Sequence, residues 1–386
     1  MIRAYKYKLK PTVKQQKMLS QTFGNVRFIY NWGLNRKKES WEKDRKTIGY
    51  VQLAKEVTEL KKNEEFKWLN NSASESLQQS LRILDNAYTR FFKAKKGFPK
   101  FKSKKNHHDS VKFINNIKFD FEKMLVNIPR IGKVKFCKNR MFKDVKLGTL
   151  TVTRDRCGDF WCTIVVDDGK PSMPKAKVCE ETSVGIDLGI KDYAILSDGT
   201  KYGNPKFLEN GQNRLSRLQQ GLSKKMKGSK NYEKQRIKVA RQHRKIANRR
   251  SDFIHKLTTS LISRFDTICI ENLNVIGMMQ DANHGLANSI QSAAWNEFKR
   301  QLEYKSEMYG KNVILIGRFE PSSKTCSRCG YLKKDLTLSD REWVCPICGE
   351  HHERDVNAAN NIKIFALHPQ AQVGFERKLV KNERQN

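Results

Sequence analysis

The stretch CPICGEHHERDVNAANNI, residues 345–362, decides how this chain is interpreted, because it joins a cysteine pair to an acidic residue at the start of a helix-like run. Cys345 and Cys348 form the CPIC pair, and Cys326 and Cys329 form a CSRC pair fifteen residues upstream. This C-x2-C-x15-C-x2-C spacing is typical of a zinc ribbon with four thiolate ligands. Four protein ligands leave no position for water, so we expect one structural Zn²⁺ here and the chemistry elsewhere.

The chain is strongly basic. Its 386 residues include 76 Lys and Arg against 40 Asp and Glu, which gives a formal net charge of +36. Residues 211–250 hold fourteen Lys or Arg and one acid, Glu233, and residues 93–105 hold seven Lys and no acid. A generally basic soluble protein would not concentrate its charge in this way. The pattern therefore predicts a polyanionic partner.

The composition also bounds the class of protein. Hydrophobic residues make up 38% of the chain, enough to bury the cores of about two to four domains. No run of eighteen apolar residues occurs, and the start MIRAYKYKLK lacks the apolar region of a secretory signal. We expect no membrane partner and a reducing, cytoplasmic compartment. The cysteines outside the two pairs are expected to be thiols and not disulfides: Cys137, Cys157, Cys162, Cys179 and Cys269.

The first half of the chain changes from helical to strand-like patterns. Residues 2–9 alternate as a strand, and apolar residues then recur at helical spacing from residue 11 to about residue 96. The stretch GFPKFKSKKNHH ends this helical lobe. Short β-like runs over residues 110–168 predict a small antiparallel barrel, completed by the N-terminal strand. The polar residues 167–177 predict a linker.

The second half alternates strands and helices. SVGIDLG and DYAILSDGT predict two paired strands, and GTKYG a third. Residues 211–265 predict a basic helical hairpin that turns near KGSKN. TICIENLNV predicts a buried strand, residues 286–310 predict one amphipathic helix, and NVILIG predicts another strand. A short helix is expected to start near Asp355. The polar tail beyond residue 368 is expected to be disordered.

Three acids stand among apolar residues at the ends of these elements: Asp187 in VGIDLGI, Glu271 in ICIENLN and Asp355 in HERDVNAANNI. Any one of them alone is more often a turn residue or a helix cap. A charged group bounded this way is costly to bury without a partner, and a divalent cation is a suitable partner for carboxylates. An acid on a first strand, a second on a later strand and a third on a final helix is the order of an RNase H-like nuclease core.

These residues resemble those of the TnpB family, transposon-encoded RNA-guided DNA endonucleases related to the type V CRISPR effectors. The resemblance covers nearly the whole chain. It depends on GNVRFIYNWGL, GFPKFK, GIDLGIKDYAILSDG, HKLTTSLISRFDTICIENLNV, AAWNEFKRQLEYK and PSSKTCSRCG through CPICGEHHERDVNAANNI, of which the last is the most specific.

The resemblance implies an α+β multidomain fold. A β-barrel wedge domain carries an inserted helical recognition lobe, and a RuvC-like α/β nuclease domain is interrupted by the zinc ribbon. The implied boundaries are 1–10 and 106–178 for the wedge, 11–105 for the lobe, 179–320 and 350–367 for the nuclease, 321–349 for the ribbon and 368–386 for the tail.

The resemblance also implies the site and its cofactors. Asp187, Glu271 and Asp355 match the family's metal ligands, so two catalytic Mg²⁺ ions are expected. The implied partners are a guide RNA from the transposon end and a double-stranded DNA target beside a short transposon-associated motif; a monomer is favoured. By a looser similarity, four residues would lie near that motif: Tyr50, Gln78, Asn115 and Asn116.

A guide–target heteroduplex is held through its backbone, which calls for a channel lined by Lys and Arg. The candidates for this contact are Lys100, Arg241, Arg244 and Arg249. Aromatic residues beside lysines, Tyr5 with Tyr7 and Phe98 with Phe101, could stack on bases, although core packing is the favoured role for Phe101.

Two other functions stay open. One is a non-cleaving RNA-guided DNA-binding regulator, since some relatives have lost the acidic triad, although this chain keeps it. The other is a DNA-strand transferase, since transposases also use an RNase H-like core. A ribbon just before the last acid is unusual for such transferases.

Overall fold

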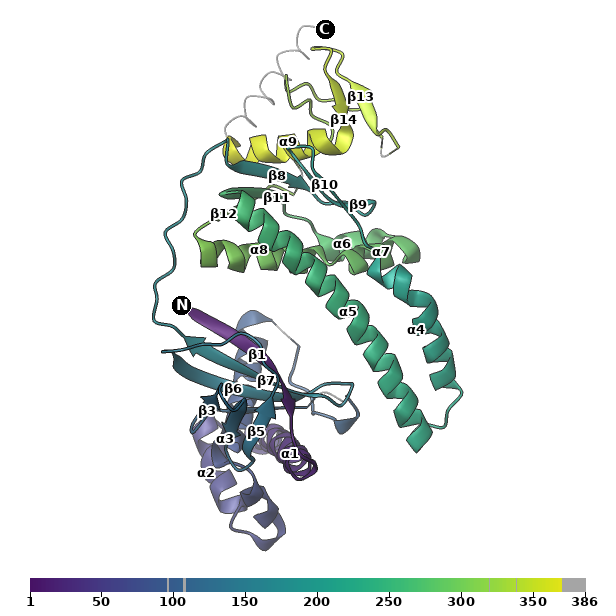
Figure 1. Ribbon diagram of the computed structural model, residues 1–386. Coiled ribbons are helices and arrows are strands. Elements are labelled where there is room, and N and C mark those ends of the chain that lie inside the picture. Colours follow the sequence, from purple (N-terminus) through teal and green to yellow (C-terminus); the bar gives the residue numbers. More distant parts are fainter. Residues whose placement is uncertain (96, 107–108, 319, 338, 370–386) are drawn as a thin grey trace. The chain divides into compact units, whose positions relative to one another are not determined.

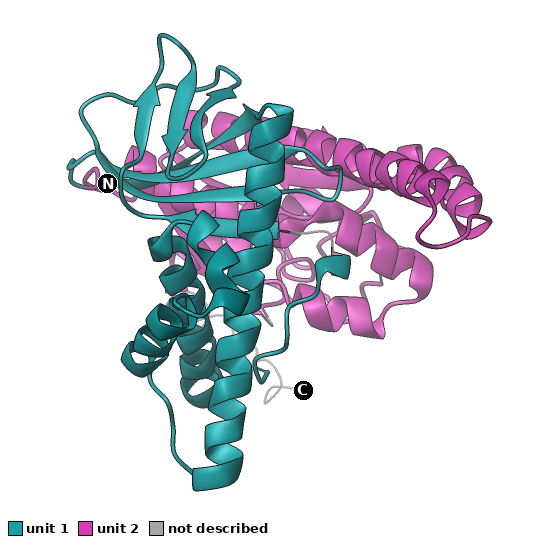
Figure 2. Ribbon diagram, turned by 90° about the horizontal axis from the view of Figure 1, so that it is seen from below, with its two compact units in different colours: residues 1–171 teal, residues 172–386 magenta. Residues whose placement is uncertain are grey.

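The computed structural model describes residues 1–95, 97–106, 109–318, 320–337 and 339–369. The chain divides into two compact units, residues 1–171 and 172–386 (Figure 2). The division falls inside the predicted linker. The expected disordered tail, residues 368–386, lies outside the described residues apart from residues 368 and 369.

Unit 1 begins with a strand and a group of helices. The helices are α1 (Val13–Asp44), α2 (Tyr50–Leu60), the 3-10 helix η1 (Glu64–Asn71) and α3 (Ser74–Ala94), so the helical pattern predicted from residue 11 to about residue 96 is confirmed. Thr12 and Gln15 form a reciprocal capping box that satisfies backbone N–H groups at the start of α1. Leu residues of α1, α2 and α3 form the helical core: Leu19, Leu34, Leu53, Leu77, Leu81 and Leu84.

Seven strands of unit 1 form one antiparallel sheet in the order β2-β6-β7-β1-β5-β4-β3. They are β1 (Ile2–Lys10), β2 (Asp109–Phe113), β3 (Lys118–Asp120), β4 (Leu125–Ile128), β5 (Gly132–Phe136), β6 (Lys146–Arg154) and β7 (Phe160–Asp167). The N-terminal strand β1 pairs with both β7 and β5, as expected. The strand order has β2 at one edge of the sheet and β3 at the other, so closure of the sheet into a barrel stays a prediction. A short 3-10 helix, η2 (Lys104–Asn106), precedes β2.

Unit 2 is built on a mixed five-stranded sheet in the order β10-β9-β8-β11-β12. The strands are β8 (Ser183–Asp187), β9 (Asp192–Leu196), β10 (Lys201–Gly203), β11 (Thr267–Glu271) and β12 (Asn312–Ile316). β8, β11 and β12 are parallel to one another, and β9 pairs antiparallel with β8 on one side and with β10 on the other. The predicted strands and the pairing of β8 with β9 are confirmed.

The helices of unit 2 lie between and after these strands. α4 (Phe207–Ser223) and α5 (Lys230–Arg264) form the predicted hairpin. The single helix predicted over residues 286–310 is wrong: α7 (His284–Ala293) and α8 (Trp295–Tyr309) are separated by Ala294, whose left-handed backbone (φ 54°) interrupts the helix. A short α6 (Val275–Asp281) precedes them, and α9 (Arg354–Leu367) follows the ribbon.

Helices cover both faces of the unit 2 sheet (Figure 1). Val184 and Ile186 of β8, with Ile268 and Ile270 of β11, pack in the core formed with α5 and α8. Cys269 and Ile316 of the opposite face pack against α9. Buried parallel strands need such two-sided cover.

The two cysteine pairs lie in a small module between β12 and α9. Its hairpin consists of β13 (Glu342–Val344) and β14 (His351–Glu353), and β14 continues directly into α9. Among the described residues, no helix combines the length and the apolar character that crossing a membrane requires. None of the nine cysteines, all of which lie among the described residues, forms a disulfide.

Candidate acidic site and cysteine cluster

Two of the predicted acids end neighbouring parallel strands. Asp187 is the last residue of β8 and Glu271 the last residue of β11. The register places Ile186 of β8 beside Ile270 of β11, so the next residues, Asp187 and Glu271, also lie side by side. Because side chains alternate between the faces of a strand, both acids lie on the face of Gly185 and Cys269, which α9 covers.

The third acid reaches the same face from α9. Asp355 is in the first turn of α9, four residues before Ala359. A Cβ atom built on Gly185 would overlap the carbonyl oxygen of Ala359, so the backbones of β8 and α9 are in direct contact there. Positions i and i+4 of a helix share one side, which places Asp355 on the side that faces β8. The structure therefore brings the three predicted acids to one end of the sheet.

At this end of the sheet the pKa of Asp187 is shifted by burial and by the charges of the other two acids. Burial, and the neighbouring charges of Glu271 and Asp355, raise the pKa of Asp187 to about 7. Burial also raises the pKa of Glu271, an effect that a hydrogen bond from Ser322 opposes. A bound cation would remove this repulsion, and carboxylate oxygens are the ligands that Mg²⁺ prefers. The donor set therefore fits a divalent cation.

Two arginines neutralise Asp355. Arg354 Nη2 lies 2.9 Å from Asp355 Oδ1, and Arg341 Nη1 lies 3.5 Å from Asp355 Oδ2. Among the described residues, the four cysteines are the one group of potential ligands gathered closely enough to hold a metal ion as they stand, and the three acids are not such a group. An ion shared by the three acids would therefore draw the carboxylates together and compete with these arginines.

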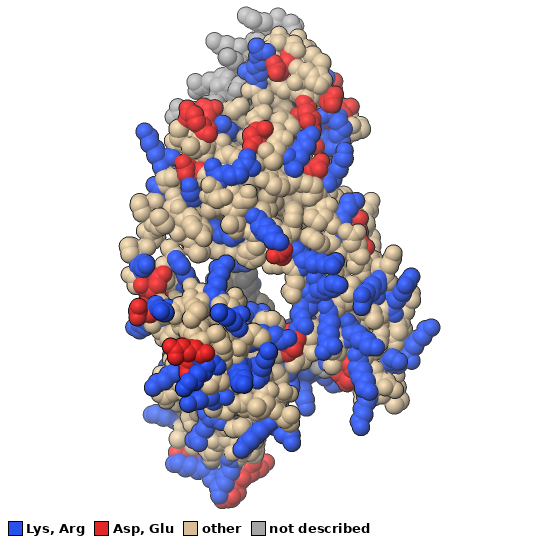
Figure 3. Space-filling view, in the orientation of Figure 1, with Lys and Arg blue, Asp and Glu red and all other residues tan. Residues whose placement is uncertain are grey.

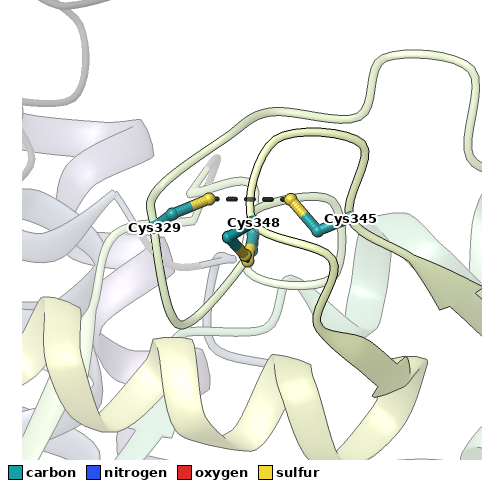
Figure 4. A group of neighbouring side chains, drawn as sticks. Cys329, Cys345 and Cys348 are labelled. Atoms are coloured by element: carbon teal, nitrogen blue, oxygen red, sulfur yellow. Dashed lines mark hydrogen bonds between the residues drawn. The ribbon is translucent and has the colours of Figure 1, made fainter.

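The four predicted cysteines converge. Their sulfur atoms lie within 4.8 Å of one another, with Cys326 to Cys348 at 3.7 Å and Cys329 to Cys345 at 3.6 Å (Figure 4). Each pair is followed by a glycine whose N–H bonds back to the carbonyl of the first cysteine, at 2.9 Å in both turns. These glycines have φ of 81° and 71°, a conformation that side chains disfavour: Gly330 and Gly349. Four thiolates at this spacing fit one structural zinc ion.

Sequence reasoning missed the residues that surround these sites. His352 Nε2 lies 3.0 Å from Cys326 Sγ, and the His352 ring packs on Trp343 at 4.6 Å between centroids. Ser322 donates to Glu271 Oε1 at 2.6 Å. One signal was available in the sequence, since Asn357 and Asn361 are polar residues at i, i+4 spacing within a helical run.

The four residues predicted near the DNA motif lie around α3 in unit 1. Gln78 and Arg82 are exposed on α3, and the Arg82 guanidinium lies 4.8 Å from the ring centroid of Tyr50. Glu75, one turn before Gln78, accepts the backbone N–H of Asn115 at 3.1 Å. Asn115 and Asn116 are exposed in the β2–β3 turn. The four residues therefore lie along one side of α3: Gln78 is on the helix, Tyr50 contacts Arg82, and Asn115, followed by Asn116, contacts Glu75.

The GFPKFK loop of unit 1 is fixed to α1 by hydrogen bonds between Asn31 and Lys102. Lys100 is exposed in this loop. Phe101 is 51% exposed, so the core-packing role favoured for it is wrong; Lys38 lies 4.9 Å from its ring centroid. Base stacking by Tyr7 is also wrong, because Tyr7 is 1% exposed and packs inside the sheet core.

A row of basic side chains follows one side of α5. These residues, here called the α5 stripe, are exposed at spacings of three or four: Lys234, Lys238, Arg241, Lys245 and Arg249. Figure 3 shows Lys and Arg gathered over the α4–α5 hairpin, at the right of the view. Arg241 and Arg249 belong to the stripe. Arg244 does not, since it is half-buried and has an interaction partner.

Three family models match the chain: one described as "Probable transposase" over residues 163–282, one as "Cas12f1-like, TNB domain" over residues 295–362, and one as "Helix-turn-helix domain" over residues 1–46. The described residues of the last range form β1 and the single long helix α1. A cryo-EM structure of a Cas12f1–sgRNA–target DNA complex matches 91% of this chain and 83% of its own, with 16% identity and a TM-score of 0.57. The chain thus shares its fold with this Cas12f1 structure, and it carries an acidic strand-end site and a four-cysteine cluster.

Curated relatives are more similar in sequence. A "Putative RNA-guided DNA endonuclease" of Streptomyces pristinaespiralis is 38% identical over 95% of this chain and 89% of its own length. A "Putative RNA-guided DNA endonuclease InsQ" of Escherichia coli K12 is 34% identical over 94% and 91%. The chain belongs to this family, the TnpB proteins.

Proposed function

We propose that this protein is an RNA-guided endonuclease that cleaves double-stranded DNA next to a short transposon-associated motif. The observation that carries the proposal is the convergence of Asp187, Glu271 and Asp355 at one end of the unit 2 sheet, where the pKa of Asp187 is raised to about 7. The names of the relatives and the Cas12-like fold support the same class of reaction.

In this proposal the three acids hold Mg²⁺. Two ions at such a site activate a water molecule and stabilise the leaving oxygen of the scissile phosphate. Asp187 and Glu271 are the last residues of paired strands, which holds the backbone that leads into each acid, and Ser322 orients the Glu271 carboxylate. Asp355 must exchange its contacts with Arg354 and Arg341 for the cation. The freed guanidinium groups can then contact phosphate oxygens.

The basic surfaces have distinct roles in the proposal. The α5 stripe holds the backbone of the heteroduplex between the guide RNA and the target strand. The side of α3 that carries Gln78, with Tyr50, Asn115 and Asn116, contacts the motif beside the target. Lys100 contributes to nucleic-acid binding from the loop on α1. Residues 1–10 and 106–178 act as the wedge, 11–105 as the recognition lobe, and 179–320 with 350–367 as the nuclease. The protein acts as a monomer in the cytoplasm.

A plasmid cleavage assay tests the proposal. The protein, a guide RNA that matches the plasmid and Mg²⁺ should yield linear product, and Asp187→Ala should reduce the rate by at least about 1,000-fold. The matched control is Asp281→Asn, an exposed acid at the end of α6. Guided binding without nicking in Mg²⁺ or Mn²⁺ would instead identify a regulator, and joined element ends a strand transferase.

A further inference from the structure

The segment between β12 and the first cysteine pair makes an unexpected contact with the acidic site. Ser322 is buried, and its hydroxyl donates to Glu271 Oε1 at 2.6 Å. Only three residues separate Ser322 from Cys326. The segment that carries the first cysteine therefore also touches one of the three acids.

The same segment is bonded to α9 by two buried asparagines. Asn361 Nδ2 donates to the carbonyl oxygens of Ser322 at 2.7 Å and Thr325 at 2.5 Å. Asn357 Nδ2 donates to Thr325 O at 2.7 Å, and Asn357 Oδ1 accepts the N–H of Ser327 at 2.9 Å.

Asn357 and Asn361 are 2% and 1% exposed. A buried amide that loses its hydrogen-bond partners costs free energy. The two asparagines therefore favour the backbone conformation of the segment that keeps these bonds, and they hold the segment against α9.

We propose that the cysteine cluster positions the acidic site through this segment, and that Ser322 is a positioning residue for Glu271. The inference deepens the proposed function and depends on it for the reaction. Zinc fixes Cys326, and the segment fixes Ser322 and Thr325. Ser322 then orients Glu271, while Asn357 and Asn361 set the position of α9 and hence of Asp355. A site usually regarded as purely structural thereby sets the geometry of two of the three acids.

The first test uses Ser322→Ala in the full-length, zinc-loaded protein with guide RNA and target DNA. The Mn²⁺ concentration that gives half-maximal cleavage should rise by about 10–100-fold, because groups that orient metal ligands contribute that much to metal affinity. The matched control is Ser323→Ala, the next residue, which should leave it unchanged. Ser322→Thr keeps the hydroxyl and should recover most of the effect. An unchanged Mn²⁺ requirement in Ser322→Ala would overturn the inference.

A second variant tests the hydrogen bonds between the segment and α9 without changing Glu271 or Asp355. Asn361→Leu keeps the branched shape of the side chain and removes both hydrogen bonds from Asn361 Nδ2 to the segment. It should also raise the Mn²⁺ requirement, and the double variant with Ser322→Ala should show less than the sum of the two effects, since both act through one segment. Strictly additive effects would show that Ser322 and Asn361 act separately, which contradicts the inference.

Hydrogen exchange gives a readout that is independent of cleavage. Removal of zinc with a chelator selective for Zn²⁺ over Mg²⁺ should increase exchange in the first two turns of α9, and Asn361→Leu should do so with zinc still bound. If the wild-type protein does not cleave, the proposed function fails, but exchange still decides whether the cluster controls α9. Unchanged exchange in α9 after zinc loss would overturn the inference while leaving the proposed function intact.

Discussion

Gly185 of β8 and Ala359 of α9 touch through their backbones, with no room for a side chain between them. A Cβ atom on Gly185 would overlap the Ala359 carbonyl oxygen and would lie 2.8 Å from the backbone nitrogen of Lys363. This contact sets the distance between β8 and α9. It therefore also sets how closely Asp355 can approach Asp187, two residues beyond Gly185.

Gly185→Ala should destabilise unit 2 and move α9 away from the sheet. The clash is with backbone atoms, so no side-chain rotation relieves it, and overpacking of this kind costs about 3 kcal/mol. Thermal unfolding should show a midpoint several degrees lower. Gly203→Ala in β10 is the control, because no atom lies within 4 Å of its added Cβ. Equal midpoints for the two variants would show that the contact is not tight.

Asp187→Asn should stabilise the protein at pH 8 when no Mg²⁺ is added. The pKa of Asp187 is raised from 3.8 to about 7, so the folded protein keeps a proton that the unfolded chain loses. Stability from this group is present below about pH 4 and declines until about pH 7. Asparagine does not titrate, so it removes this loss of unfolding free energy, which amounts to about 4 kcal/mol. Chemical unfolding between pH 4 and 8 measures the unfolding free energy of both proteins.

Two comparisons make that measurement specific. Asp281→Asn, an exposed acid that is not among the charges that shift the pKa of Asp187, should unfold like the wild type at every pH. Added Mg²⁺ should stabilise the wild type and not Asp187→Asn, because a cation that binds only the folded state shifts the equilibrium towards it. A wild-type stability that rises from pH 4 to 7 relative to Asp187→Asn would contradict the assignment.

The purified protein should contain about one zinc ion per chain, and Cys345→Ser should lose it. A structural zinc site contributes its binding energy to folding, so the region 321–353 should become sensitive to proteases in this variant. Metal analysis and limited proteolysis measure the two effects. Cys179→Ser, an exposed thiol outside the cluster, should keep the zinc. Full zinc content in Cys345→Ser would exclude the four-thiolate site.

Lys238→Gln with Arg241→Gln should weaken guide RNA binding and reduce its dependence on salt. Each phosphate contact that is lost lowers the slope of log affinity against log salt by about one. The charge-matched control is Lys62→Gln with Lys67→Gln, whose ammonium groups pair with Glu59 and Glu64. Binding titrations at several salt concentrations measure the slopes. Equal slopes in both double variants would argue against the α5 stripe as an RNA surface.

Much of this architecture follows from local sequence patterns. Apolar runs predicted β8, β11 and β12, and the CxxC spacing predicted the cysteine cluster, because both depend on residues close together in the chain. The convergence of Asp187 and Glu271 follows from the order of the strands once they form a parallel pair.

Other features depend on contacts that no local pattern encodes. The break at Ala294 occurs within an uninterrupted amphipathic pattern, where tertiary packing outweighs helix propensity. The burial of Tyr7 follows from the central place of β1 in its sheet, and the exposure of Phe101 from the course of a loop. The bond from Ser322 to Glu271 joins residues 51 positions apart and becomes visible only in three dimensions.

If Asp187, Glu271 and Asp355 share divalent cations at the scissile phosphate, Mn²⁺ should bind between them. Anomalous scattering from Mn²⁺, in crystals of the protein with its guide RNA and target DNA, locates the ions. We expect anomalous peaks within about 2.5 Å of carboxylate oxygens from all three acids. Peaks that lie elsewhere, with the three carboxylates sharing no ion, would contradict this expectation.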